Sequence, residues 1–566
     1  MNPSPFFIVY TASLLCVSAC IMAIILRSLL WERDDALEKF SVPQPPKSHA
    51  GLWFILVILF GLGISGYYVL RYHGLWMETD SATITLTIES LRREAILPPT
   101  RYSYQGGFGY QAVSVALLYA TGLTTQTLQT IVYPLLAAVG LMLSSFIFFR
   151  EVLRDHRVAA LASMLLIFQP DILFVTMRGS HEKMTWPLMM LALAFLYRSF
   201  GQPLRKMAVY VGLYYLVVFA LDTTNVFFGS VFLVAVVLSM TLGFFLFRFW
   251  TNRRPPLPRQ DVQRLMYISL SGGILIYIFI MYLYPPALAN LRMLRNVIDQ
   301  LSALLLSFEI KAQPYGYISL SWINPQVYLM LTAFTWMLIA TSFLEWLRHG
   351  WKMLKGEAAR GLVENLDWLL YTGFAIQIAI SILVDLSGAL SANMQLRLFP
   401  SFTIMAIVLL VRSLRRIFAA SSLRINPRRV LLGLSALLSA WFTLATVLKA
   451  TNDPSLCNKW TFYLPTDKAA VRWVDAHLRQ VRIWDGIDER LNTIYNSFFL
   501  LDSQGENIYR YGEVNTIFRY VLLTDLDRLR MKRLGIQLLP VSYWDQLYDN
   551  GAAQLDRIPL YLLESP

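Results

Sequence analysis

The sequence predicts a polytopic α-helical membrane protein with about 12 transmembrane helices and a small C-terminal α/β domain. Of its 566 residues, 56% are hydrophobic and only 15% are charged, and the mean hydropathy is +0.49. Soluble domains carry about 25% charged residues, so this composition excludes a soluble enzyme, a disordered regulator and a secreted disulfide scaffold. Apolar stretches long enough to cross about 30 Å of hydrocarbon recur through residue 448 and then stop.

These apolar stretches give the predicted transmembrane spans. They cover residues 6–29, 51–70, 125–149, 157–173, 183–199, 207–223, 226–248, 265–284, 326–345, 366–385, 396–412 and 429–448. The first stretch contains Val17-Ser18-Ala19-Cys20, which resembles a bacterial lipoprotein cleavage box, but no Lys or Arg precedes it. Because a secretory signal begins with a basic segment, we expect an uncleaved first helix.

The connections between the spans fall into two groups by charge. Lys and Arg gather in alternate connections, at 33–47, 150–157, 198–206, 253–264, 348–360 and 412–429. Cytoplasmic loops of membrane proteins collect such residues, which accounts for the net charge of +13 without nucleic-acid binding. We therefore expect a multi-pass protein of the cell membrane whose N-terminus and C-terminal domain lie on the extracytoplasmic face.

The other connections are long and rich in acidic and aromatic residues. Residues 71–124 include a Gly-rich segment from Tyr104 to Tyr110. Residues 285–325 mix leucines with charged residues, a pattern typical of amphipathic helices on a membrane surface. Polar groups concentrated at one membrane face predict a functional site at that face.

The C-terminal residues, 450–566, are predicted to form a soluble extracytoplasmic α/β domain behind a membrane domain of residues 1–449. Thr466 and Asp467 are candidate N-caps of its first helix. The expected strands lie at 482–484, 520–523 and 560–563, and a further helix at 525–534.

An acidic pair, Glu78 and Asp80, follows the second span. A carboxylate at a membrane boundary is costly unless it is compensated, so the pair is a functional candidate. The structural alternative, compatible with the first, is that Asp80 caps a helix starting at Ser81. Residues 83–88 alternate polar and apolar residues like a strand, whereas the apolar positions through Ala95 have helical spacing, which we favour.

A second polar cluster separates the fourth and fifth predicted spans. It contains Asp171, Arg178, His181, Glu182 and Lys183. Cations, an imidazole and carboxylates at the outer end of a span favour a functional role. The structural alternative is that Ser180 caps the next helix and Glu182 stabilises its first turn, but this leaves His181 and the two cations without a role.

The third candidate is Arg397, at the external end of a late span. An arginine there departs from the positive-inside trend, and a lipid phosphate or pyrophosphate is the anion it would meet at that depth. Snorkelling to ordinary headgroups is the structural alternative.

Together these features resemble the GT-C superfamily, integral-membrane glycosyltransferases that use polyprenyl-phosphate or polyprenyl-pyrophosphate sugars. Glu78-Thr79-Asp80 resembles the acidic motif that opens the first external loop of oligosaccharyltransferases and protein mannosyltransferases. Residues 178–182 are similar to an Arg-containing motif of the second external loop, and Arg397 lies where the family often places a donor-phosphate ligand. The resemblance covers residues 51–400 as architecture and implies GT-C-like external loops.

The sequence also departs from the oligosaccharyltransferases. His181 precedes Glu182 where they usually have an Asp-rich string, and the terminal domain lacks their Trp-Trp-Asp signature. Asn-glycosylation of sequons is therefore not supported. The resemblance instead implies a lipid-linked monosaccharide donor.

The reaction implied by the resemblance is an inverting sugar transfer to an extracytoplasmic glycan, lipid or protein, with Asp80 as general base and Glu78 in support. The implied site residues are Asp80, Glu78 and Glu182 for catalysis, Arg397, Lys183 and Arg178 for the donor phosphate, and His181 and Asp171 for the acceptor or a metal. The metal stays open, because superfamily members differ in their use of a divalent ion such as Mg or Mn.

Two other classes of protein compete with this interpretation. A transporter or flippase of a lipid-linked or polar substrate would also have about twelve spans, but its polar residues would gather near the membrane midplane. A noncatalytic membrane scaffold would leave the acidic loops without a role. The sequence does not identify the sugar, the lipid carrier or the acceptor.

Overall fold

The computed structural model describes most of the chain. The described residues are 5–38, 50–76, 79–97, 107–200, 202–249, 259–278, 287–307, 325–355, 362–388, 394–420, 425–451, 453, 456, 462, 464–484, 507–510, 518–535 and 544–558.

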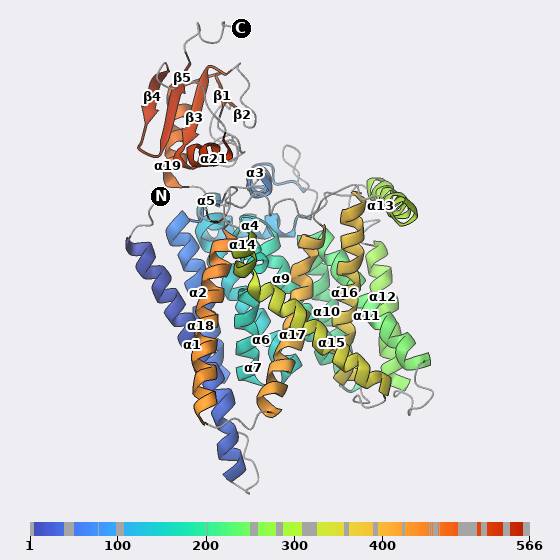
Figure 1. The fold of residues 1–566 in the computed structure, drawn as a ribbon. Helices are drawn as coiled ribbons and strands as arrows, with labels where there is room; N and C mark the ends of the chain where they lie inside the picture. The colour runs from blue at the N-terminus through green and yellow to red at the C-terminus, as the bar shows by residue number, and fades with distance from the viewer. Residues whose placement is uncertain are drawn as a thin grey trace.

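The membrane domain is a bundle of helices (Figure 1). In chain order they are α1 (Pro5–Glu38), α2 (Ala50–Tyr72), α3 (Thr79–Glu94), α4 (Gly109–Thr121), α5 (Thr125–Thr127), the π-helix η1 (Leu128–Val132), α6 (Tyr133–Leu153), α7 (His156–Ile167), α8 (Pro170–Met177), α9 (Glu182–Ser199), α10 (Leu204–Thr224), α11 (Val226–Phe249), α12 (Arg259–Ile278), α13 (Ala287–Ser307), α14 (Pro325–Leu331), α15 (Ala333–Lys355), α16 (Leu362–Ser387), α17 (Met394–Ala420) and α18 (Ile425–Ala450).

The predicted multi-span character is confirmed. Within the described ranges, eight helices are long and apolar enough to cross a membrane, or nine if the bent pair α7 and α8 counts as one. The predicted spans at 183–199 and 265–284 correspond to α9 and α12, whereas the predicted span at 326–345 is divided at Thr332 between α14 and α15. The sequences of α9, α12 and α15 each carry three or four charged residues.

One predicted span, 157–173, is wrong as a single helix. It is broken into α7 and α8, which meet at an angle of 76°. The cause is local, because Pro170 has no N–H to continue α7 but suits the first turn of a new helix, and Gln169 before it is extended. α8 ends at Met177, immediately before Arg178, so the bend sets the position of the segment that joins α8 to α9.

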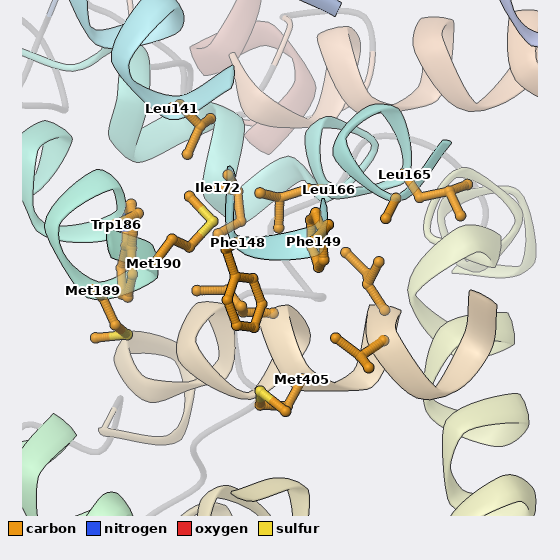
Figure 2. Packing of buried hydrophobic residues seen from close by; sticks show 14 of the residues in the cluster. Leu141, Phe148, Phe149, Leu165, Leu166, Ile172, Trp186, Met189, Met190 and Met405 are labelled. Atoms are coloured by element: carbon orange, nitrogen blue, oxygen red, sulfur yellow. The ribbon is translucent and has the colours of Figure 1, made fainter. Parts of the chain in front are cut away.

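The centre of the bundle is packed from α6, α7, α8, α9 and α17. Figure 2 shows Phe148, Leu166, Ile172, Met190 and Met405 converging from these five helices, and each is at most 1% exposed. Protein interiors are close-packed and deform little, so this core supports the segment that joins α8 to α9.

The basic connections meet at one end of the bundle, as their charge pattern predicts. Arg415 donates to the carbonyl of Leu153 at 3.2 Å, and Arg157 donates to the carbonyl of Ser28 at 3.1 Å. Figure 1 shows α3, α13 and the C-terminal domain at the other end, with α13 lying across it. The expected amphipathic helix in 285–325 is therefore found as α13, while 308–324 lie outside the described residues.

The C-terminal domain is a small mixed α/β unit, as predicted. Its elements are α19 (Pro465–His477), β1 (Arg482–Trp484), β2 (Ile508–Arg510), β3 (Tyr520–Thr524), α21 (Asp525–Leu534), β4 (Asp545–Asp549) and β5 (Ala553–Arg557). The strand order is β2-β1-β3-β5-β4, with β1 parallel to β2 and β3, and β5 antiparallel to β3 and β4.

Two expected strands and the second expected helix of this domain are confirmed as β1, β3 and α21, and the expected strand at 560–563 lies outside the described residues. The predicted N-caps of α19 are wrong, since the helix begins two residues earlier, after Leu464. Asp467 instead lies in its first turn and accepts the backbone N–H of Leu464 at 3.0 Å.

The described residues between α18 and α19 pack on the C-terminal end of α2. Phe462 stacks on Tyr72 with ring centroids 4.7 Å apart and forms an antiparallel bridge with Trp76. Arg71 and Asp453 form an ion pair at 2.8 Å. These contacts fix the C-terminal domain to the segment that leads from α2 into α3.

Candidate active site

The helix expected after the second span is confirmed as α3, and its strand-like alternation is overruled. Ile84 and Ile88, four residues apart, are both fully buried on its inner face. The capping prediction is wrong in detail, because α3 begins at Thr79 and Asp80 therefore lies in its first turn rather than before it. A carboxylate there is favoured by the helix dipole.

The turn between α2 and α3 is fixed by two close approaches that only glycine permits. Gly74 has φ +67°, and a Cβ on it would lie 1.7 Å from the carbonyl oxygen of Thr130. A Cβ on Gly179 would lie 2.2 Å from the indole ring of Trp76, which is itself buried. The described residues just after α2 are thereby packed against the segment that joins α8 to α9.

Arg178 links the two sequence motifs into one cluster. Its Nη2 lies 3.2 Å from Oδ2 of Asp80, and its Nη1 lies 3.2 Å from Oε2 of Glu182. The guanidinium also lies over the ring of Phe174, 5.3 Å from its centroid. The side chain of Arg178 is 9% exposed and that of Glu182 is 14% exposed, whereas that of Asp80 is 48% exposed. The result is a buried cation that holds an accessible carboxylate.

His181 lies under this cluster and is 3% exposed. Burial, followed by the charge of Arg178, lowers its pKa from 6.5 to about 3, against a smaller opposite effect of Asp80. The imidazole is therefore neutral at physiological pH. A neutral His181 can orient a hydroxyl group, but it does not supply positive charge to a phosphate.

The buried His181 makes stability depend on pH. Because its pKa is about 3 in the folded protein and 6.5 when unfolded, the unfolded chain binds the extra proton as the pH falls, so this stability is complete above pH 6.5 and is lost toward pH 3. We expect a slope of up to about 1.4 kcal/mol per pH unit between pH 6 and 4. The apparent melting temperature should fall less steeply in His181→Gln, whereas the exposed-site control His477→Gln should behave like wild type.

Lys183 lies behind the cluster. It is 1% exposed, its Nζ has no hydrogen-bond partner among the described residues, and it lies 5.4 Å from the ring centroid of Tyr133. Next to it is a buried polar layer that the sequence analysis missed, in which Tyr110 donates to Gln129 and Ser114 pairs with Tyr133, both at 2.7 Å. The available signal was the four-residue spacing of polar residues in α4 and from η1 to α6.

The other predicted site residues lie apart from this cluster or outside the described chain. Asp171 lies in the first turn of α8, where it interacts electrostatically with Lys449 at the end of α18. Arg397 is exposed in the first turn of α17, and no hydrogen bond or ion pair among the described residues joins it to Arg178, Asp80 or Glu182. Glu78 is outside the described residues.

The start of α17 is set by a carboxylate from the preceding helix. Asp385 accepts the backbone N–H of Met394 at 2.7 Å and that of Gln395 at 2.8 Å. These bonds satisfy two of the unpaired donors of a helix N-terminus. They fix the place from which Arg397 projects.

The cluster does not fit a divalent metal ion in the part of the chain that the structure describes. There, no three His, Cys, Asp or Glu side chains gather in a metal-binding arrangement. The carboxylates of Asp80 and Glu182 instead face the guanidinium of Arg178. The expected use of Mg or Mn therefore stays a prediction, and no step below depends on it.

A methyl group on Gly179 should disrupt the cluster. Gly179→Ala forces the loop away from Trp76, at a cost of about 1–3 kcal/mol, and displaces Arg178 from Asp80. Displacements of about 1 Å at an active site cost on the order of 10²-fold in rate. We expect such a loss of turnover with a lower melting temperature, whereas Gly212→Ala, whose Cβ would have nothing within 4 Å, should change neither. Wild-type turnover in Gly179→Ala would contradict the packing of this loop.

Comparison of the chain with known proteins finds solved structures of similar fold. No protein-family model matches the chain, and a comparison with curated proteins gives no match. The apo oligosaccharyltransferase of Archaeoglobus fulgidus aligns with a TM-score of 0.52 and 13% identity, over 90% of this chain and 75% of that one. ArnT from Cupriavidus metallidurans, in its structure with undecaprenyl phosphate, aligns with a TM-score of 0.47 and 12% identity, over 92% of this chain and 100% of that one. The likeness to the oligosaccharyltransferase shows that the chain shares the fold of that protein, in agreement with the GT-C-like architecture expected from the sequence.

Proposed function

We propose that the protein is a membrane glycosyltransferase that moves a sugar from a polyprenyl-phosphate or polyprenyl-pyrophosphate donor to an extracytoplasmic acceptor, with inversion. The observation that carries this proposal is the half-exposed carboxylate of Asp80, held by the buried Arg178 at the end of a GT-C bundle. The site lies at the end opposite to the basic connections, which the positive-inside rule assigns to the cytoplasm.

In the proposed reaction Asp80 is the general base. Its carboxylate takes the proton of the acceptor hydroxyl group as the acceptor oxygen attacks the anomeric carbon of the sugar. The bond between that carbon and the phosphate oxygen breaks, and the lipid phosphate leaves with the electron pair. The ion pair with Arg178 fixes the direction of the carboxylate, which is the condition for an efficient proton transfer at a defined position.

Arg178 and Arg397 take different roles in this proposal. The guanidinium of Arg178 is engaged by Asp80 and Glu182, so we assign it the positioning of the two carboxylates. Arg397 is exposed in the first turn of α17, at the opposite end of that helix from Arg415, which contacts the basic end of the bundle through Leu153, so it is available to the departing phosphate. Burial, followed by the charge of Arg178, lowers the pKa of Lys183 from 10.5 to about 7, so Lys183 adds positive charge only in its protonated form. His181, neutral and buried, supports the acceptor side.

Removing Arg397 should impair use of the donor rather than folding. For Arg397→Ala we expect a raised apparent KM for the lipid donor if the contact forms in the ground state as well as in the transition state. The matched control is Arg295→Ala, which removes an 86% exposed arginine from α13 at the same end. Steady-state kinetics over a range of donor concentrations would measure the difference, and equal KM values for the two variants would remove Arg397 from the donor site.

The function can be tested in cells by mass analysis of membrane glycolipids and surface glycans. Cells lacking the protein should accumulate a lipid-linked sugar and lose one glycosylated product, and Asp80→Asn should not restore that product. A transporter or flippase predicts a different result, in which an intact lipid-linked sugar accumulates on the cytoplasmic face and Asp80→Asn has no specific effect on glycosidic bonds.

A further inference from the structure

A cavity of about 370 Å³ lies between the membrane domain and the C-terminal domain. The turn after α2 lines it with His73, α5 and η1 line it with Thr127 and Ile131, and α19 lines it with Lys468 and Arg472. Its volume is at the lower end of the range found for ligand pockets.

The polar wall of this cavity is cationic. Lys468 and Arg472 are four residues apart and so lie on one face of α19, and His73 lies on the wall formed by the membrane domain. None of the described residues that line the cavity is Asp or Glu. Both cations of α19 thus line the same cavity and present positive charge to a ligand inside it.

Lys468 keeps its charge in spite of its burial. It is 8% exposed, and burial, followed by the charge of Arg472, lowers its pKa from 10.5 to about 8. At pH 7 the ammonium form still predominates. The charge of Lys468 is thus present on the cavity wall under physiological conditions.

The opposite wall of the cavity opens toward lipid. α5 and η1 begin the membrane span Thr125–Leu153, so the cavity lies at headgroup depth. Ile131 on the cavity wall is 42% exposed, and Leu136 further along the same span is 50% exposed. An apolar, outward-facing surface therefore continues from the cavity into the hydrocarbon layer.

We propose that this cavity binds the phosphate headgroup of an anionic membrane lipid, whose acyl chain lies along the outer face of the Thr125–Leu153 span. The lipid phosphate would pair with Lys468 and Arg472 and so join the C-terminal domain to the membrane domain. This site is separate from the Asp80–Arg178–Glu182 cluster and does not depend on the proposed transferase activity.

The test is native mass spectrometry of the full-length, delipidated protein titrated with phosphatidylglycerol, with phosphatidylcholine or with inorganic phosphate. We expect tight binding of phosphatidylglycerol, weak binding of the zwitterionic lipid and no displacement of phosphatidylglycerol by a similar concentration of inorganic phosphate. Arg472→Gln should weaken binding about 5-fold, and Lys468→Gln with Arg472→Gln about 30-fold. The control Arg479→Gln, an exposed cation just beyond α19, should bind like wild type.

Three outcomes would overturn the proposal. Equal binding of the two lipids, or unchanged phosphatidylglycerol binding in Arg472→Gln, would show that the cations do not select an anionic headgroup. Displacement by inorganic phosphate at equal concentration would show a site for the free anion without a lipid chain. Arg472 is exposed, so its single variant stays informative if the double variant fails to fold.

Discussion

Asp80→Asn should abolish most of the activity and leave the fold intact. Asn is accommodated near a helix N-terminus about as well as Asp, so α3 should keep its first turn. The amide cannot accept the acceptor proton, and loss of a general base lowers turnover by a factor on the order of 10² to 10⁴. The measurement is the rate of donor consumption by purified protein, together with its melting temperature.

The matched control for this variant is Asp299→Asn, which changes a carboxylate that is 68% exposed on α13. It should keep wild-type turnover. If Asp80→Asn also turned over at the wild-type rate, Asp80 would be reduced to a structural residue at the start of α3. The base would then move to Glu182, or the transferase proposal would give way to a transporter.

The second large effect is expected at Arg178. In Arg178→Gln the carboxylate of Glu182, only 14% exposed, loses its cation, and the removal of one partner from such a buried pair costs about 3 kcal/mol. The carboxylate of Asp80 also loses the guanidinium group that fixes its orientation. We expect a lower melting temperature and a loss of turnover about as large as that of Asp80→Asn.

A double variant separates these two consequences. Adding Glu182→Gln to Arg178→Gln removes the unpaired charge, so the melting temperature should recover most of its loss. Turnover should not recover, because Asp80 stays without its guanidinium partner. Recovery of turnover together with stability would mean that Arg178 acts only on folding, and it would contradict its positioning role.

The membrane class and the helical identity of α3 could be predicted because each depends on local pattern. Apolar length and charge balance are sufficient for the first, and the spacing of Ile84 and Ile88 for the second. Asp80, Arg178 and Glu182 could also be predicted as site residues, because carboxylates and cations at a membrane boundary are energetically costly and therefore indicate a functional role.

The contact between these residues could not be predicted from local pattern. Asp80 and Arg178 are 98 positions apart in sequence, and they meet because Gly74 approaches the backbone of Thr130 and Gly179 lies flat against Trp76. Such close approaches depend on the tertiary packing of both partners.

Two local features were misjudged for a different reason. The apolar run through 157–173 concealed the break at Gln169-Pro170, although Pro at a first helical position is a recognised helix start. The start of α19 was placed too late because Asp467 reaches back to Leu464 from the third helical position, as a carboxylate in a first turn often does.

The central claim is that the protein cleaves a polyprenyl-phosphate sugar with Asp80 as base. The direct measurement uses purified protein in lipid nanodiscs with a panel of polyprenyl-phosphate sugars and candidate acceptors, and follows free polyprenyl phosphate and the anomeric configuration of the product. We predict stoichiometric release of the lipid phosphate, an inverted anomeric centre, and release lowered at least about 10²-fold in Asp80→Asn. Equal release by wild type and Asp80→Asn, or a product with retained configuration, would contradict the account.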